Sequence, residues 1–350
     1  MTRRQWLASL PAMASLKGYQ SPTPPFERID THTHIHRKAP VLFADLEKNR
    51  WRCLSICVSR AIGDEPSDLE ELIRGSIEVH RVTKGRIAWA TAFDARGFEG
   101  RDFAGRANDG LRQSYDNGAI AVKIWKNVGM GIRSKSSEYL LPDHAALAPV
   151  FDAIEKADKT LIAHLAEPDG AWLPLDKNNP EIAYYGSHPE WHMYGRPGVP
   201  AKETILAARD RILERHPKLR VVGCHLGSDE EHWDRLAKRL DKYPNFAVDV
   251  AARVRYFVRG DHEQARQFLI KYQDRVLYAT DFTLASGDDA GAARELQETH
   301  DRDWKFFAGK DTLTYRNRQV PGLGLPERVV QKVFRENALR WLPGIADAWP

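Results

Sequence analysis

Short, nearly continuous apolar runs alternate with amphipathic segments along almost the whole chain. Such runs are typical of parallel strands buried on both faces, because neither face has to present polar side chains to water. We therefore expect eight parallel strands, at residues 29–34, 53–59, 87–93, 119–125, 160–166, 219–226, 246–252 and 276–282.

The amphipathic segments between the runs predict helices. The sequence Ser67-Asp68-Leu69-Glu70 has the form of a capping box and predicts a helix that ends near residue 83. Further helices are predicted at residues 142–157, 203–216, 230–243, 261–272 and 326–342. Eight alternating β and α units predict a (β/α)8 barrel, the TIM-barrel fold, and a doubly wound open sheet is the alternative.

Two connections in this pattern are too long to be simple turns. They cover residues 167–200, after the fifth run, and 283–325, after the eighth, and both are rich in Trp, Tyr and Phe. Long ordered loops in a compact domain are usually functional, and in a barrel they surround the C-terminal face where active sites lie. We expect loops that cover a substrate. An aromatic interface between subunits of a homo-oligomer is the alternative.

Ionisable side chains stand at the C-terminal ends of several runs. The first run continues as Asp30-Thr31-His32-Thr33-His34-Ile35-His36, and strand alternation places its three imidazoles on one face. Runs five, six and eight end in His164, His225 and Asp281, and run four contains Lys123. Buried ionisable groups are costly unless they are paired or metal-bound, and imidazole is the commonest metal ligand. The pattern favours a metal site.

With these residues the chain resembles the amidohydrolase superfamily, in particular its amidohydrolase-related branch. The resemblance extends over roughly residues 27–345. It is carried by Asp30-x-His32-x-His34, His164, His225, Thr280-Asp281-Phe282 and Glu336-Asn337-Ala338. It implies a barrel, a divalent metal ion held by His32, His34 and Asp281, and either hydrolysis or non-oxidative decarboxylation.

Two versions of the implied site remain open. In the mononuclear version His32, His34, His164 and Asp281 hold one ion, most simply Zn²⁺, and His225 acts as an acid or base beside it.

In the binuclear version Lys123 is carbamylated and bridges two ions, and His164 and His225 bind the second ion. Lys123 lies on the fourth strand, where binuclear members of the superfamily keep a lysine. The alternative is an ordinary lysine paired with a carboxylate. Lys126 is the weaker candidate for carbamylation, because three residues further along it is expected on the opposite face or in a loop.

The expected reaction follows from the charge of such an ion, which lowers the pKa of bound water to about 7. Asp281 is expected to take the proton of that water, and the metal or His225 to polarise the carbonyl group under attack. We therefore expect a hydrolase for an amide, ester or lactone of a small carboxylated or cyclic molecule. The alternatives are a decarboxylase of an aromatic or enol carboxylic acid, and a binding protein without turnover.

Four further residues are candidates for contact with a substrate. His36 lies one step beyond the His pair, and Glu167 follows His164 closely enough to orient a ligand. Trp172 lies in the first long connection and could stack on a ring. Arg253 follows the seventh run and could bind a carboxylate.

Composition narrows the partners to small molecules. The formal net charge is only +4, and no long basic run is interleaved with aromatic residues, so nucleic acid is not expected. No stretch of about 18 apolar residues predicts a membrane span. Cys53, Cys57 and Cys224 all lie in apolar runs and are expected to be core residues.

The N-terminal residues differ in kind from the rest of the chain. Arg3-Arg4, a mild apolar segment and Ala12-Met13-Ala14 resemble the three parts of a twin-arginine export signal. We expect residues 1–25 to be this signal and a Pro-rich linker, and residues 26–350 to form the barrel. Export would place the enzyme in the periplasm. A cytoplasmic enzyme is the alternative.

Overall fold

The predicted barrel is present. The computed structural model describes residues 26–285, 287–315 and 317–348, so the expected signal and linker lie outside the described residues. Nine parallel strand segments form one curled sheet in the order β8-β7-β6-β5-β4-β3-β2-β1-β9. The segments are β1 (Arg28–His34), β2 (Trp51–Ile56), β3 (Ile87–Ala92), β4 (Ala119–Ile124), β5 (Thr160–Ala163), β6 (Val221–Gly223), β7 (Phe246–Asp249), β8 (Val276–Leu277) and β9 (Phe282–Thr283).

The last apolar run closes the barrel. It is divided into β8, which pairs with β7, and β9, which pairs with β1. Between these two segments the backbone N–H of Thr31 donates to the carbonyl oxygen of Tyr278 (3.0 Å), and that of Asp281 donates to the carbonyl oxygen of His32 (2.9 Å). The sheet therefore has no free edge between its first and last strands, and the open-sheet alternative is wrong.

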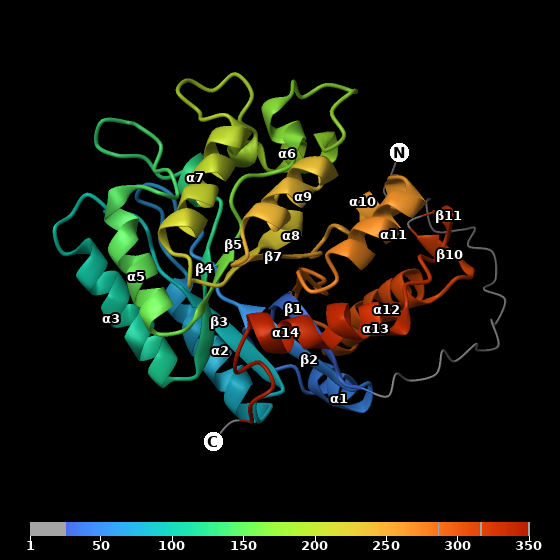
Figure 1. The fold of residues 1–350 in the computed structure, drawn as a ribbon. Helices are drawn as coiled ribbons and strands as arrows, with labels where there is room; N and C mark the ends of the chain where they lie inside the picture. The colour runs from blue at the N-terminus through green and yellow to red at the C-terminus, as the bar shows by residue number, and fades with distance from the viewer. Residues whose placement is uncertain (1–25, 286, 316, 349–350) are drawn as a thin grey trace, which may run out of the picture.

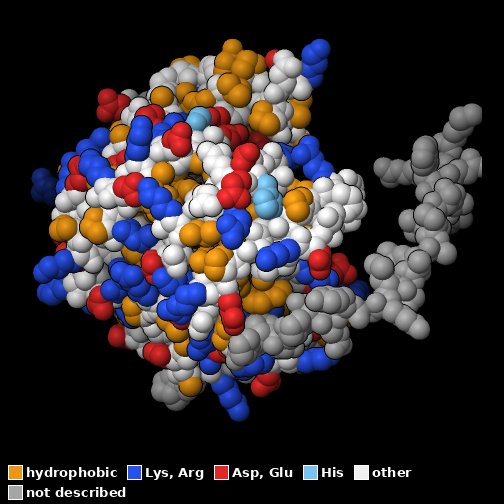
Figure 2. Space-filling model, turned by 45° about the vertical axis from the view of Figure 1, so that its right-hand side comes forward, with side chains coloured by type: hydrophobic (Ala, Val, Ile, Leu, Met, Phe, Trp, Pro, Cys, Tyr) orange, Lys and Arg blue, Asp and Glu red, His pale blue; other side chains and the backbone are white. Residues whose placement is uncertain are grey.

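Helices surround the strands on the outside of the barrel (Figure 1). The larger ones are α1 (Pro40–Lys48), α2 (Leu69–Val82), α3 (Phe103–Asp116), α5 (Ala148–Lys156), α7 (Lys202–Arg215), α9 (Trp233–Lys242), α11 (His262–Lys271) and α12 (Asp289–Ala308). The short ones are α4 (Asn127–Met130), α6 (Ile182–Ser187), α8 (Cys224–Gly227), α10 (Val254–Arg259), α13 (Glu327–Gln331) and α14 (Asn337–Trp341). On the face shown in Figure 2, basic and acidic side chains are intermixed.

The C-terminal segment closes the N-terminal end of the barrel. The predicted helix at 326–342 is interrupted by a π-helical turn at Lys332–Glu336, which separates α13 from α14. Trp341, Leu342 and Ile345 pack with inward-facing strand residues in one buried cluster. The hydroxyl of Thr160 also donates to the carbonyl oxygen of Trp341 (2.5 Å). Burial of these apolar side chains fixes the segment under the strands.

The two long connections differ in structure. Residues 167–200 contain the 3-10 turns Asp169–Trp172 and Pro189–Trp191 and the short helix α6, with loops between them. We expected residues 283–325 to be a loop, and this expectation is wrong. Most of them form α12 and a hairpin of β10 (Thr312–Tyr315) and β11 (Arg318–Pro321). The amphipathic repeat of α12 buries Leu296, Phe306 and Phe307, and this pattern was available in the sequence.

Asp30 joins β1 to the last strand from below the His pair. Its Oδ2 accepts from the hydroxyl of Thr280 (2.6 Å) and from Nε2 of His300 on α12 (3.0 Å), and its Oδ1 accepts from the backbone N–H of Thr280 (3.1 Å). The ring of His300 stacks on Trp51, with ring centroids 3.8 Å apart. Each oxygen of this buried carboxylate is thus satisfied, as a buried charge requires.

Among the described residues, no helix is both long and apolar enough to cross a membrane. The three cysteines are buried and unpaired, as expected.

Asp303 on α12 gives the fold a pH-dependent stability. Burial raises its pKa to about 7, although Arg302 and the hydroxyl of Tyr278 (3.2 Å) stabilise its charged form. As the pH rises, the unfolded chain releases this proton first, so stability falls between the ordinary aspartate pKa and about 7. Asp303→Asn should therefore raise the free energy of unfolding at about pH 8 by an amount on the order of 2 kcal/mol.

Chemical denaturation of both proteins at several pH values measures this effect. The gain should vanish near pH 4, where the native aspartate is protonated. A gain that is equal at both pH values would show that removal of the charge is not its cause.

Candidate metal centre

The predicted metal ligands meet at the C-terminal end of the barrel. Nε2 of His32 and Nε2 of His34 each lie 3.4 Å from Oδ1 of Asp281. Ligand atoms of His32, His225 and Asp281 all lie within 4.8 Å of one another. His164 completes the group, with its ring centroid 4.3 Å from that of His225.

The hydrogen bonds of two imidazoles leave the same nitrogen free. Nδ1 of His34 bonds to the carbonyl oxygen of Ile56 (2.8 Å), and Nδ1 of His225 bonds to that of Ala251 (2.9 Å). A carbonyl oxygen can only accept, so these nitrogens carry the proton and each Nε2 keeps a lone pair for a metal ion.

Asp249, the last residue of β7, holds His32 in the same way. Its Oδ2 accepts from Nδ1 of His32 (2.8 Å), and its Oδ1 accepts from the backbone N–H of His225 (2.7 Å). One buried carboxylate therefore orients one ligand and fixes the backbone of another. Such support around metal-binding histidines is a common feature of metal sites.

An unusual backbone presents His225 to the site. His225, Leu226, Gly227 and Ser228 all have positive φ angles of 57–62°. Asp281 also has a positive φ (69°). Non-glycine residues rarely adopt this conformation, and it persists where surrounding contacts enforce it, often at functional sites. No sequence pattern indicated this turn.

Charge sets the protonation of the group. Burial raises the pKa of Asp281, but His225, His34 and His32 outweigh burial and hold that pKa well below its ordinary range. Burial lowers the pKa of His164 to about 4 and that of His225 well below its usual value. Three of these groups are thus in the protonation state that a metal ion requires at neutral pH.

His32 is the exception. Burial and the nearby Lys123 lower its pKa, but Cys224 and Asp249 outweigh them and raise it to about 10. A metal ion has to compete with a proton for this nitrogen, so metal binding at His32 releases a proton.

Lys123 lies at the floor of the site. Its Nζ is 3.4 Å from Nε2 of His32 and 2.9 Å from Sγ of Cys224. His32, Cys224 and Asp249 form a second group of close ligand atoms. Among the described residues, the alternative of a carboxylate partner is not its contact, since the atoms within hydrogen-bond distance are an imidazole nitrogen and a sulfur.

Lys126 also reaches the site, contrary to our expectation that it faces away. Strand alternation ends with β4 at Ile124, and Lys126 has helical backbone angles that turn its side chain back. It is 2% exposed, and its Nζ forms an ion pair with Glu167 and donates to the hydroxyl of Tyr184 (3.0 Å).

A cavity of about 180 Å³ opens above the ligands. Besides the ligands and Lys123, it is lined by Val58, Arg60, Trp125, Lys126, Tyr184 and Thr283.

The four residues proposed for substrate contact do not line this cavity. His36 bonds to the hydroxyl of Ser76 on α2 (2.9 Å), and Trp172 donates to the carbonyl oxygen of Pro200 (3.0 Å).

Arg253 forms a buried ion pair with Glu230 (2.8 Å), and Glu167 lies behind Lys126, 3.5 Å from Nε2 of His164. The residues that line the cavity beyond the ligands include instead Arg60, Lys126 and Tyr184. Asp249 and Arg60, which sequence reasoning missed, both lie at or just beyond strand ends, and that position was a usable signal.

The comparisons with known proteins agree with this site. A family model described as Amidohydrolase matches residues 111–344. The chain belongs to the amidohydrolase family. This family typically binds a divalent metal ion, and it includes decarboxylases and isomerases, so membership supports an enzyme without fixing its reaction. No curated protein sequence matches the chain.

Two solved structures show the same fold. An uncharacterised TIM-barrel protein from Bordetella bronchiseptica is 13% identical, with 91% of this chain and 99% of that chain covered and a TM-score of 0.52. A Staphylococcus aureus protein assigned to the amidohydrolases is also 13% identical, with the same coverage and a TM-score of 0.50. At this identity the likeness concerns the fold alone.

Asp249→Asn tests the support of His32. The amide keeps the shape of the side chain but lacks the charge that orients Nδ1–H, so metal affinity should fall about 10–100-fold. Titration of the metal-free protein with Zn²⁺ against a chromophoric chelator measures the change. Asp241→Asn, an exposed change on α9, should leave the affinity as it is. Equal affinities for both variants would contradict this role of Asp249.

Proposed function

We propose that this amidohydrolase is a metal-dependent hydrolase that cleaves an amide, ester or lactone bond of a small carboxylated molecule. The convergence of Nε2 of His32 and Nε2 of His34 on Oδ1 of Asp281, with a ring nitrogen of His225 in the same group, carries this proposal. The donor set suits Zn²⁺, because nitrogen and carboxylate oxygen are preferred zinc ligands. Nε2 of His164 is buried and makes no close hydrogen bond among the described residues, with Oε1 of Glu167 lying 3.5 Å away. This nitrogen would therefore suit a fourth ligand.

His32, His34 and Asp281 would hold the ion, with His164 or His225 beside them. When bound, the ion would act as a Lewis acid and lower the pKa of a water molecule. Oδ2 of Asp281 would accept the proton of the attacking water, since Oδ1 already faces the two histidines. That proton would then pass to the leaving group.

The cavity charge supports a carboxylated substrate. Arg60 lies at the rim, with 46% of its side chain exposed, and Lys126 lies deeper. The charge of Lys126 is shared with Glu167, whereas the ion pair of Arg60 among the described residues, with Asp68, is loose (3.6 Å). A bidentate guanidinium is well suited to hold a carboxylate at the open end of the cavity. The small volume favours a compact substrate.

Asp281→Asn should lower turnover far more than it lowers metal affinity. Loss of the proton acceptor should reduce kcat by about 10²–10⁴-fold, because general base catalysis contributes that much. Metal content by atomic emission and turnover on carboxylated amides, esters and lactones measure the two effects separately. Asp64→Asn, in an exposed loop, is the matched control. Near-normal turnover by the Asp281 variant would remove the proposed role.

The identity of the products distinguishes hydrolysis from the decarboxylase alternative. A hydrolase incorporates oxygen from labelled water into the new carboxylate and releases no carbon dioxide. Metal-dependent carbon dioxide release, without incorporation of water into the product, would overturn the proposed reaction.

Lys123 is proposed as a site of carbamylation. Its ammonium group lies close to Nε2 of His32, where a cation opposes metal binding and a carbamate would favour it. We expect intact-mass spectrometry under native conditions with zinc and bicarbonate to show the mass of one added carbon dioxide. Lys123→Arg should lose it, while Lys126→Arg should retain it. An unmodified chain with a single bound ion would favour the mononuclear site.

A further inference from the structure

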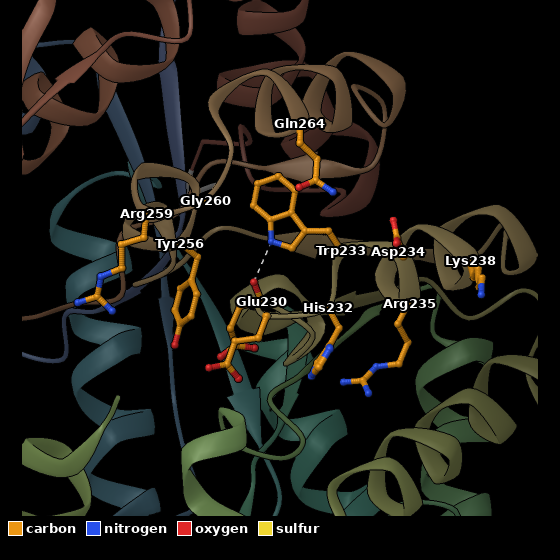
Figure 3. Close-up of a pocket in the computed structure, with 11 residues that line it drawn as sticks. Glu230, His232, Trp233, Asp234, Arg235, Lys238, Tyr256, Arg259, Gly260 and Gln264 are labelled. Carbon is orange, nitrogen blue, oxygen red and sulfur yellow. Dashed lines mark hydrogen bonds between the residues drawn. The ribbon is translucent and has the colours of Figure 1, made fainter. Parts of the chain in front are cut away.

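A cavity of about 740 Å³ lies between the start of α9, α10 and the start of α11, and it shares no lining residue with the cavity above the metal ligands. Figure 3 shows two of its cationic side chains, Arg259 and Lys238, on opposite sides of Trp233. A third, Arg235, is already paired with Asp229 (2.5 Å). Because these charges do not converge on one point, this larger cavity does not indicate a ligand.

The smaller cavity above the metal ligands contains the buried ammonium group of Lys126. The residue is 2% exposed, and its Nζ lies 4.5 Å from the ring centroid of Trp191 and 5.1 Å from that of Trp125. A buried charge is costly unless it is paired. The ion pair with the buried Glu167 and the two aromatic faces meet this requirement. Lys126 and Glu167 together carry no net charge.

Lys126 uses a further N–H to hold the hydroxyl group of Tyr184 on α6. Its Nζ donates to that hydroxyl oxygen (3.0 Å). An ammonium group can only donate, so the phenol oxygen accepts and its own O–H is directed elsewhere. Among the described residues, the hydroxyl proton of Tyr184 has no hydrogen-bond acceptor. Tyr184 therefore keeps one free donor.

The position of Tyr184 makes this donor accessible from the cavity. Its ring stacks on His188, with centroids 4.5 Å apart, and has an edge-on contact with Tyr185, with centroids 5.2 Å apart. Tyr184 lines the cavity, and the residue is 37% exposed, so a bound molecule can reach it. Burial raises the pKa of Tyr184, and the hydroxyl therefore keeps its proton at neutral pH.

The contact with the ammonium group strengthens the donor. Hydrogen bonds in series polarise one another, so donation from Lys126 into the phenol oxygen makes the O–H of Tyr184 a stronger donor. The cavity is only about 180 Å³ and is also lined by Asp281 and His225. A compact substrate that reaches these two residues therefore also lies close to Tyr184.

We propose that Tyr184 is a further catalytic residue, whose hydroxyl donates a hydrogen bond to the anionic oxygen that forms on the substrate when water attacks, and that Lys126 positions this hydroxyl. The inference rests on the proposed function and adds to it a donor from the connection after β5. A donor held in place before the reaction stabilises the developing charge without reorganisation. A neutral hydroxyl gains most as that charge forms, so it acts on turnover more than on substrate binding.

Tyr184→Phe removes the hydroxyl and keeps the ring. In the zinc-loaded chain it should weaken the binding of methylphosphonate, a tetrahedral anion, about tenfold or more, because hydrogen bonds to charged groups are the stronger ones. Isothermal titration calorimetry measures this affinity. Tyr194→Phe is the matched control, since Tyr194 lies in the same connection, is 53% exposed and does not line the cavity. The control should bind methylphosphonate like the native chain.

Turnover provides the second measurement. On a compound that the native chain hydrolyses, Tyr184→Phe should lower kcat about 10²-fold and leave KM nearly unchanged, as expected for a donor that acts in the transition state. Decarboxylation in place of hydrolysis would remove the proposed function, whereas the methylphosphonate titration tests the hydroxyl independently of the reaction.

A double-mutant cycle tests the positioning role of Lys126. Lys126→Met combined with Glu167→Gln removes both charges and so leaves no buried charge unpaired. At saturating Zn²⁺ this change should weaken methylphosphonate binding in the native background and alter it little in the Tyr184→Phe background, because Lys126 acts through the hydroxyl. Equal losses in both backgrounds would overturn the role of Lys126. Equal methylphosphonate affinities of the Tyr184→Phe and Tyr194→Phe variants would overturn the whole proposal.

Discussion

The closure of the barrel between the last strand run and β1 is the constraint on which the candidate metal centre depends. Backbone bonds across this seam fix Asp281 opposite His32 and His34, which come from the other end of the chain. Because a change of strand register by one residue reverses which side chains face inward, the site exists only with this pairing. Asp30 holds the same seam from below through Thr280.

Two buried carboxylates divide the support of the site between them. Asp30 satisfies backbone and side-chain donors around the last strand, and Asp249 orients His32 and the backbone of His225. Neither would bind a metal ion in this role, yet each determines where a ligand nitrogen points. The metal ligands are therefore held by rigid strands, while the rim residues that would select a substrate come from the connections beyond the strand ends.

The cavity above the metal ligands is lined by both acidic and basic side chains. Asp281 and the imidazole nitrogens face the place where a cation would bind, whereas Arg60 and Lys126 face the space above it. Negative and positive side chains are therefore separated within one small cavity.

The sequence by itself determined the eight-strand pattern, the barrel and the residues at the strand ends, because buried parallel strands and period-two alternation are local properties. Family membership was also recognisable from those residues. The sequence could not predict that the side chain of Lys126 points into the site, because its direction depends on where β4 ends and the chain turns. The sequence also could not predict that Arg253 pairs with Glu230 or that His36 contacts Ser76 on α2. Those contacts join residues far apart in the chain, and only the packing of the helices and long connections on the closed barrel brings them together or keeps them apart.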